Sequence, residues 1–184
     1  MSGEHEAADA HRQQDLYFNE LFQLTVQCKY MRRYRNILAR RVRGLEILRA
    51  VASNGAIVTW AIVQSHPMVW GTIIALSQLS DALKDAIPMT ARHKAANGLV
   101  VSLDALLIEA LYEWESVFGG QFTNEEITER RRKLMELRHK AEVEHFPTGD
   151  LPKREDLLRL AEGDAVDYLQ TMFEPVARAY FERL

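Results

Sequence analysis

The chain has 184 residues, with 23 Lys and Arg, 26 Asp and Glu, and a formal net charge of −3. This length suffices for one domain with its own core, and the acidic balance argues against a general nucleic-acid-binding protein, whose phosphate contacts need a cationic surface. The single cysteine, Cys28, excludes an internal disulfide and fits a reducing compartment.

The N-terminal third of the sequence predicts a long helix. Residues 1–14 are polar and acidic and lack an apolar h-region, so we expect them to be disordered and not a cleavable signal peptide. From residue 15 onward, an apolar side chain recurs every seven positions, at Tyr17, Leu24, Met31, Leu38 and Leu45, with Leu21, Cys28 and Val42 between them. This heptad-like pattern is typical of a helix that packs along a partner helix.

Two short apolar segments follow, at 50–63 and 68–80, separated by Gln64-Ser65-His66-Pro67. Proline stops one helix and is tolerated in the first turn of the next, so the pattern predicts a helical hairpin. Seven basic residues precede the hairpin before the first acid at Glu46: Lys29, Arg32, Arg33, Arg35, Arg40, Arg41 and Arg43. Lys84, Arg92 and Lys94 follow it.

The hairpin has two interpretations. A bilayer core of roughly 30 Å needs about 20 apolar residues, and runs of 10–14 are more often core helices of a soluble bundle. Three features favour a membrane. Positive charge lies at both ends, as expected for cytoplasmic termini; Trp60 and Trp70 lie near the turn, as interfacial aromatic residues do; and small residues recur four apart.

Three further helices are predicted after the hairpin. One spans about 89–118, with an apolar stripe at Ala96, Leu99, Leu103, Leu106, Ala110, Trp114 and Val117. The next, about 124–145, begins at a capping box formed by Thr123 and Glu126, and its apolar side is Ile127, Leu134, Leu137 and Ala141. The last begins near Lys153, with an inner face of Leu157, Leu160, Ala161, Tyr168, Met172 and Val176. The predicted fold is all-α, with a central short apolar hairpin and no β-sheet.

This order of parts resembles that of the SLATT proteins, two-transmembrane effectors of bacterial defence systems. An Arg- and Tyr-rich helix, Tyr30-Met31-Arg32-Arg33-Tyr34-Arg35, leads into two short apolar helices and a long amphipathic helix that starts near Arg92-His93-Lys94. The resemblance divides the chain into the N-terminus of residues 1–14, a SLATT-like region at 15–120 and a C-terminal helical extension at 121–184. It implies a homo-oligomer in the inner membrane with both termini cytoplasmic. Such an oligomer permeabilises the membrane when a separate protein that senses a nucleotide second messenger is activated.

The candidate site residues follow from the membrane interpretation. Polar side chains inside an apolar hairpin are expected to face one another or water, which makes Asn54, Ser77, Gln78 and Asp81 candidates for lining a pore or an interhelical contact. Arg40, Arg41 and Arg43 are expected to contact anionic headgroups, at roughly 1 kcal/mol each.

Two alternatives remain open. The chain is also consistent with a cytoplasmic, soluble helical bundle that acts as an oligomeric adaptor. Arg132 and His139, seven positions apart on one helix face, resemble the active-site pattern of HEPN ribonucleases, in which an arginine holds a phosphate and a histidine assists proton transfer. We find no phosphate-binding glycine-rich loop, nucleophile elbow or Cys-x-x-Cys motif, and we expect no enzyme activity, metal or cofactor.

Overall fold

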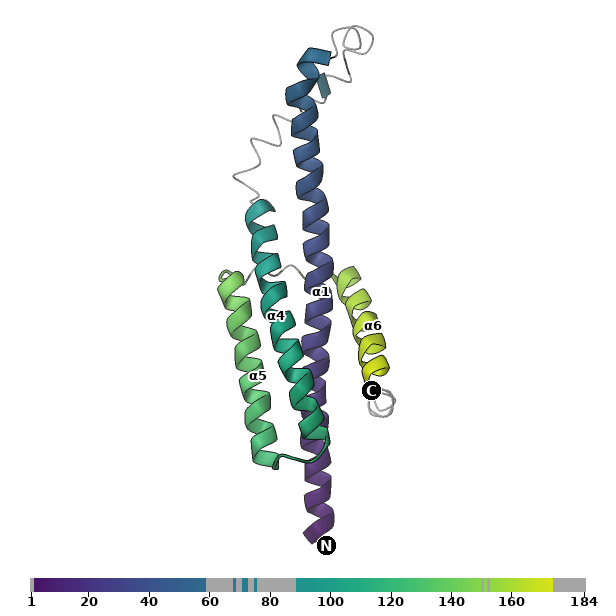
Figure 1. The fold of residues 1–184 in the computed structure, drawn as a ribbon, viewed down its shortest axis with the longest axis vertical. Coiled ribbons are helices and arrows are strands. Elements are labelled where there is room, and N and C mark those ends of the chain that lie inside the picture. Colours follow the sequence, from purple (N-terminus) through teal and green to yellow (C-terminus); the bar gives the residue numbers. More distant parts are fainter. Residues whose placement is uncertain are drawn as a thin grey trace. The chain divides into compact units, whose positions relative to one another are not determined.

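The computed structural model describes residues 2–58, 68, 71, 72, 75, 89–149, 151 and 153–173, with the backbone alone for residues 2–10, 48–49 and 51–58. Its long helices are α1 (Ser2–Val58), α4 (Met89–Phe118), α5 (Asn124–His145) and α6 (Glu155–Met172) (Figure 1). No strand occurs among the described residues, which confirms the all-α fold class. Most of the predicted hairpin lies outside them.

The chain divides into two compact units, one comprising Met1–Tyr34 and Ala95–Leu184 and the other Arg35–Lys94. In the first unit, α4 and α5 lie beside the N-terminal half of α1, and α6 lies against α1 on the side away from α5 (Figure 1). This division differs from the one predicted at residue 120, because α5 and α6 belong to the same unit as α1 and α4. Residues 2–14, which were predicted to be disordered, are helical and form the start of α1.

Helix α1 begins at Ser2, ahead of the heptad pattern, which starts only after residue 15. The amide of Gln14 donates a hydrogen bond of 3.0 Å to the carbonyl oxygen of Val117. The heptad residues of the bundle, Tyr17, Leu24 and Met31, are fully buried, as are Leu21 and Cys28 between them. The seven-residue spacing therefore identified the face of α1 that packs against its neighbours.

Helix α4 contributes a wide face to this core. Its buried face is Ala96, Leu99, Val100, Leu103, Leu107, Ala110, Trp114 and Val117. Six of the seven predicted positions are confirmed, whereas Leu106 is only half-buried and Val100 and Leu107 are buried in addition. The buried face is wider than the predicted stripe because α4 packs against both α1 and α5.

An aromatic cluster joins α4 to α1. The Trp114 ring lies 5.0 Å from the ring of Phe18 and 6.2 Å from that of Tyr17, centroid to centroid. The Tyr17 hydroxyl donates to Glu113 at 2.9 Å, and Arg130 of α5 pairs with the other carboxylate oxygen at 2.7 Å. Burial, followed by the charge of Glu113, raises the pKa of Tyr17. A single carboxylate thus joins three helices.

Helix α5 begins as the sequence predicts. The amide of Glu126 donates to the Thr123 hydroxyl, and the Thr123 amide donates to the Glu126 carboxylate, which forms the capping box. These bonds hold the pKa of Glu126 below its ordinary value. Ile127, Leu134 and Ala141 are buried as expected, whereas Leu137 is half-buried.

Helix α6 contacts α1 through a narrower face than predicted. Its buried residues are Leu157, Ala161, Ala165 and Leu169, spaced four apart. Leu160 and Met172 are exposed, so their assignment to the inner face is wrong. A helix held against one neighbour buries a single stripe, and the two alanines in that stripe allow a close approach. Val176 lies outside the described residues.

A glycine lies at a close contact between α4 and α5. A Cβ atom at Gly98 would lie 2.6 Å from Cε1 of His145, the ring that contacts the Ser102 hydroxyl at 3.2 Å. At Gly163 of α6, a Cβ atom would meet no atom within 4 Å. Gly98 and Gly163 therefore differ in the space around them.

We predict different effects of alanine at Gly98 and Gly163. Alanine in a helix interior is favoured over glycine by about 1 kcal/mol, so Gly163→Ala should raise the free energy of unfolding by that amount. Gly98→Ala should lose this gain because it displaces the His145 ring, and should recover it in a His145→Ala background. Urea denaturation of the four variants measures the coupling. Equal gains at both glycines in the parent chain would contradict the contact.

Candidate functional site: the basic and apolar part of α1

The structure divides the predicted basic run into two parts with different surroundings. The first part belongs to the bundle. Arg32 pairs with Asp104 of α4 at 2.9 Å, and Arg33 binds Asp164 of α6 through Nε at 2.9 Å and Nη2 at 2.6 Å. The Lys29 ammonium lies 4.3 Å from the centroid of the Tyr168 ring. These cations are partnered within the chain and bind its own helices together.

The second part is Arg40, Arg41 and Arg43, which we call the basic segment. All three side chains are exposed on α1, and none has an ion-pair partner among the described residues. Arginine carries five donors on a group that stays charged at any physiological pH. An exposed group of such side chains suits an anionic surface, which supports the predicted role of these three residues.

Apolar side chains of the unit that contains the basic segment are also exposed. Ile47, one turn further along α1, is 58% exposed, and Met68 is 85% exposed. The Thr72 hydroxyl donates to the carbonyl oxygen of Met68 at 2.9 Å, a bond within its own helix turn. That bond satisfies the only polar hydrogen of this side chain, so Thr72 suits an apolar environment without a further partner.

The predicted polar and aromatic residues of the hairpin are not brought together by the described structure. Asn54 lies in the helical backbone of α1, but its side chain is outside what is described. Ser77, Gln78, Asp81, Trp60 and Trp70 all lie outside the described residues. The pore or interhelical contact assigned to them stays a prediction.

One helix among the described residues, α4, is long and apolar enough to cross a membrane. Much of that apolar surface is buried within the protein, because one face of α4 forms part of the core of the bundle. Asp104 and Glu113 on α4 pair with Arg32 and Arg130 of the neighbouring helices. These contacts fit a core helix, so α4 adds little support to a membrane-spanning role.

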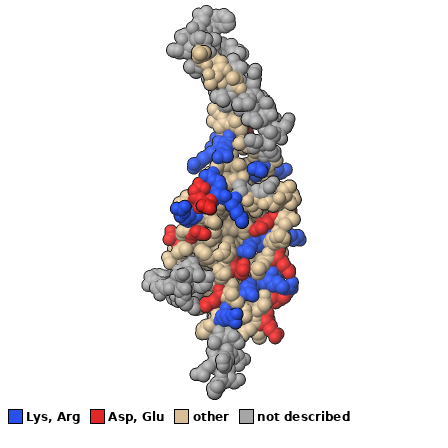
Figure 2. Space-filling view, turned by 180° about the vertical axis from the view of Figure 1, so that it is seen from behind, with Lys and Arg blue, Asp and Glu red and all other residues tan. Residues whose placement is uncertain are grey.

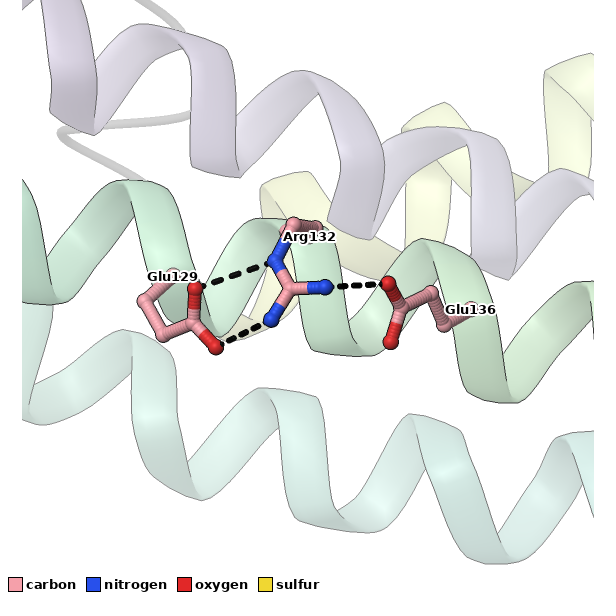
Figure 3. Close-up of polar contacts among 3 residues, drawn as sticks. All are labelled: Glu129, Arg132 and Glu136. Carbon is pink, nitrogen blue, oxygen red and sulfur yellow. Dashed lines mark hydrogen bonds and ion pairs between the residues drawn. The ribbon is translucent and has the colours of Figure 1, made fainter.

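The alternative ribonuclease pair lies on the surface of α5. Arg132 and His139 are both exposed, and the Arg132 guanidinium lies between two carboxylates of its own helix, Glu129 and Glu136, each at 2.5 Å (Figure 3). The hydrogen bonds and charge of Glu129, with the charge of Glu136, raise the pKa of Arg132. A guanidinium with two carboxylate partners has little charge left for a phosphate, so this geometry does not favour the ribonuclease interpretation.

Other chemically active side chains of the bundle are used in packing. Desolvation raises the pKa of the Cys28 thiol to about 12, with the charge of Asp104 adding to the effect, so the thiol stays protonated. Glu142 bonds to Gln27 while His145 contacts Ser102. Among the described residues no three His, Cys, Asp or Glu side chains are grouped as a metal site.

The charges of the bundle surface are mixed in sign. Acidic and basic side chains are interspersed over the face seen in Figure 2, and many form ion pairs between helices. Comparison with protein-family models, curated proteins and solved structures found no match. The basic segment and the apolar residues after it are therefore the surface on which a functional argument rests.

Proposed function

We propose that this protein is a membrane-associated helical effector that oligomerises and permeabilises the bacterial inner membrane. The observation that carries the proposal is the basic segment: three exposed arginines without an acidic partner among the described residues, directly ahead of an apolar stretch of chain. The arginines of the same run that lie within the bundle have partners. Within this run, the arginines without an ion-pair partner among the described residues are those nearest the predicted membrane segment.

The physical argument combines two modest attractions. Each Arg near an anionic leaflet contributes about 1 kcal/mol, and burial of an apolar side chain such as Ile47 adds roughly 1.5–3 kcal/mol. Neither anchors a protein alone, whereas the two together recruit it to the surface and orient the hairpin. Basic residues on both sides of the hairpin favour cytoplasmic termini.

The proposed role in antiphage defence rests on the order of the parts: Arg-rich helix, two short apolar helices and long amphipathic helix. In this role the hairpins of several copies assemble, and Asn54, Ser77, Gln78 and Asp81 face a shared polar path. A separate sensor protein that responds to a nucleotide second messenger would supply the trigger. The two apolar segments are short and contain polar residues, so they suit insertion into the membrane on assembly better than permanent anchoring.

The proposal is tested by expressing the full chain in bacteria and measuring its location and the membrane potential. We expect the protein in the membrane fraction and depolarisation of cells when it is produced at high level. Asn54→Leu and Gln78→Leu should abolish depolarisation without lowering expression, because they remove the polar path. Thr72→Val is the matched control and should keep activity, since the Thr72 hydroxyl bonds its own helix.

Fractionation separates this proposal from the soluble adaptor. Protein that stays in the supernatant without detergent, both at rest and while cells depolarise, would contradict the membrane role. Depolarisation that survives both leucine substitutions would refute the assignment of the polar path.

A further inference from the structure

Helix α4 carries a second apolar face that none of the described helices covers. Val101 is 62% exposed, Ile108 58% and Tyr112 71%, and Ala105 is exposed between them. Steps of four, three and four residues separate Val101, Ala105, Ile108 and Tyr112, so all four lie along one side of the helix. We call these four residues the outer stripe. The exposed side chain of Asn97, four residues ahead of Val101, continues the same line.

The outer stripe is distinct from the buried face of α4 and from its contact with α5. The core side carries residues such as Leu103 and Ala110, and α5 is reached through Glu113 and through Gly98 and Ser102, which face His145. A soluble helix normally carries polar residues opposite its core face. An apolar stripe in that place marks an interaction surface.

We propose that the outer stripe binds the outer stripe of a second copy of this chain, with the two α4 helices antiparallel. An antiparallel pair can be centred on the midpoint between Asp104 and Ala105, because Val101 and Ile108 are equally far from it. Val101 then lies level with Ile108 of the second copy, so the two largest aliphatic side chains of the stripe contact each other.

The polar end of the line fits the same register. Asn97 and Tyr112 are also equally far from the midpoint, so each Asn97 lies level with Tyr112 of the second copy. A carboxamide both donates and accepts hydrogen bonds, as does a phenolic hydroxyl. The pair therefore places a polar partner beside the Tyr112 hydroxyl at each edge of an apolar centre, which is the usual arrangement of a protein interface.

The charges beyond the stripe favour the antiparallel arrangement as well. Lys94 and Glu115 are exposed on α4 and have no ion-pair partner among the described residues. Both are equally far from the midpoint, so the antiparallel pair places each Lys94 level with Glu115 of the second copy. A parallel pair would bring like charges together at both ends and place two Tyr112 side chains at one level.

The charge of α4 also argues against a lipid surface as the occupant. The charged residues between Asn97 and Phe118 are all acidic. Asp104, Glu109 and Glu113 pair with basic residues of α1 and α5, which leaves Glu115 without an ion-pair partner among the described residues. An anionic headgroup offers Glu115 no opposite charge, whereas a second copy supplies Lys94. The contact from Asn97 to Tyr112 is about 22 Å long at a rise of about 1.5 Å per residue, which fits one crossing of two helices and a reversible dimer. This inference does not depend on the proposed membrane function.

Cysteine cross-linking of the full chain tests the geometry. Cells producing the Asn97→Cys chain are lysed with cells producing the Tyr112→Cys chain, and a mild oxidant is added. We expect a disulfide-linked heterodimer in the mixture and little dimer from Tyr112→Cys alone, because antiparallel packing separates the two Tyr112 positions by about 22 Å. The parent chain, whose only cysteine is the buried Cys28, is the background control. Efficient cross-linking of Tyr112→Cys with itself would overturn the antiparallel arrangement.

Sedimentation of the purified full chain in mild detergent tests the energetics. Lys94→Glu and Glu115→Lys should each weaken dimerisation roughly tenfold by placing like charges together, and the double variant should recover it. Tyr112→Glu should abolish the dimer, while Leu160→Glu, an equally drastic change at an exposed leucine of α6, should not. A chain that is monomeric at every concentration, or a double variant weaker than both single ones, would refute the proposal.

Discussion

Replacing the three arginines of the basic segment should weaken binding to anionic vesicles by roughly a hundredfold. Arg40→Gln, Arg41→Gln and Arg43→Gln together remove three charges, each worth about 1 kcal/mol near an anionic surface, and about 1.4 kcal/mol corresponds to a factor of ten. Because Arg40, Arg41 and Arg43 pair with no described side chain, the bundle should keep its stability. Vesicle flotation with phosphatidylglycerol and with phosphatidylcholine alone measures both the affinity and its dependence on lipid charge.

A matched control removes the same number of charges elsewhere. Lys140, Lys153 and Arg159 are exposed basic residues of the bundle unit, so Lys140→Gln, Lys153→Gln and Arg159→Gln lower the net charge equally. This control should bind vesicles nearly as the parent chain does, and the parent's affinity should fall as salt is added. If both triple variants lose affinity to the same extent, net charge and not the basic segment governs binding.

Trp114→Ala should be the most destabilising single substitution in the bundle. Truncation of a buried tryptophan costs about 3–5 kcal/mol because contacts are lost and a cavity remains. Trp114 is 2% exposed and contacts the rings of Tyr17, Phe18 and Phe118, so the loss affects the junction of α1 and α4. Thermal unfolding followed by circular dichroism should show a large fall in Tm.

Trp114→Phe separates packing from hydrogen bonding at the same site. The indole N–H of Trp114 is buried without a hydrogen-bond partner among the described residues, and a buried unpaired donor costs about 1–3 kcal/mol. Phenylalanine removes that donor while it keeps an aromatic ring, so we expect a much smaller loss than with alanine. A loss as large as that of Trp114→Ala would mean that the N–H has a partner in solution.

Local patterns of residues predicted much of the bundle. The bounds of α4 and α5 and the capping box at Thr123 follow from turn and capping residues next to each helix, and a seven-residue spacing identified Tyr17, Leu24 and Met31 as buried. The start of α1 was less predictable. Gln14 reaches Val117, a residue far along the chain, and no local pattern encodes such a bond.

The basic run shows why the candidate site needed the tertiary structure. In the sequence, Arg32 and Arg33 are indistinguishable from Arg40 and Arg41, because each is an arginine on the same helix. Only packing brings Asp104 and Asp164 beside the first two and leaves the others exposed. Likewise, the sequence shows that Leu157 and Leu160 are apolar, but the position of α6 against α1 decides that only the first is buried.

Sequence patterns alone were enough for the all-α class, for the approximate bounds of α4 and α5 and for two apolar segments of sequence behind a basic run. Those features depend on local propensity and periodicity, which neighbours along the chain establish. The tertiary structure decided which charges are neutralised within the chain and that α4 keeps an uncovered outer stripe at Val101, Ile108 and Tyr112. Whether a charge has an ion-pair partner and whether an apolar side chain is exposed depend on residues far apart in the sequence. Both are therefore decided only when the helices pack.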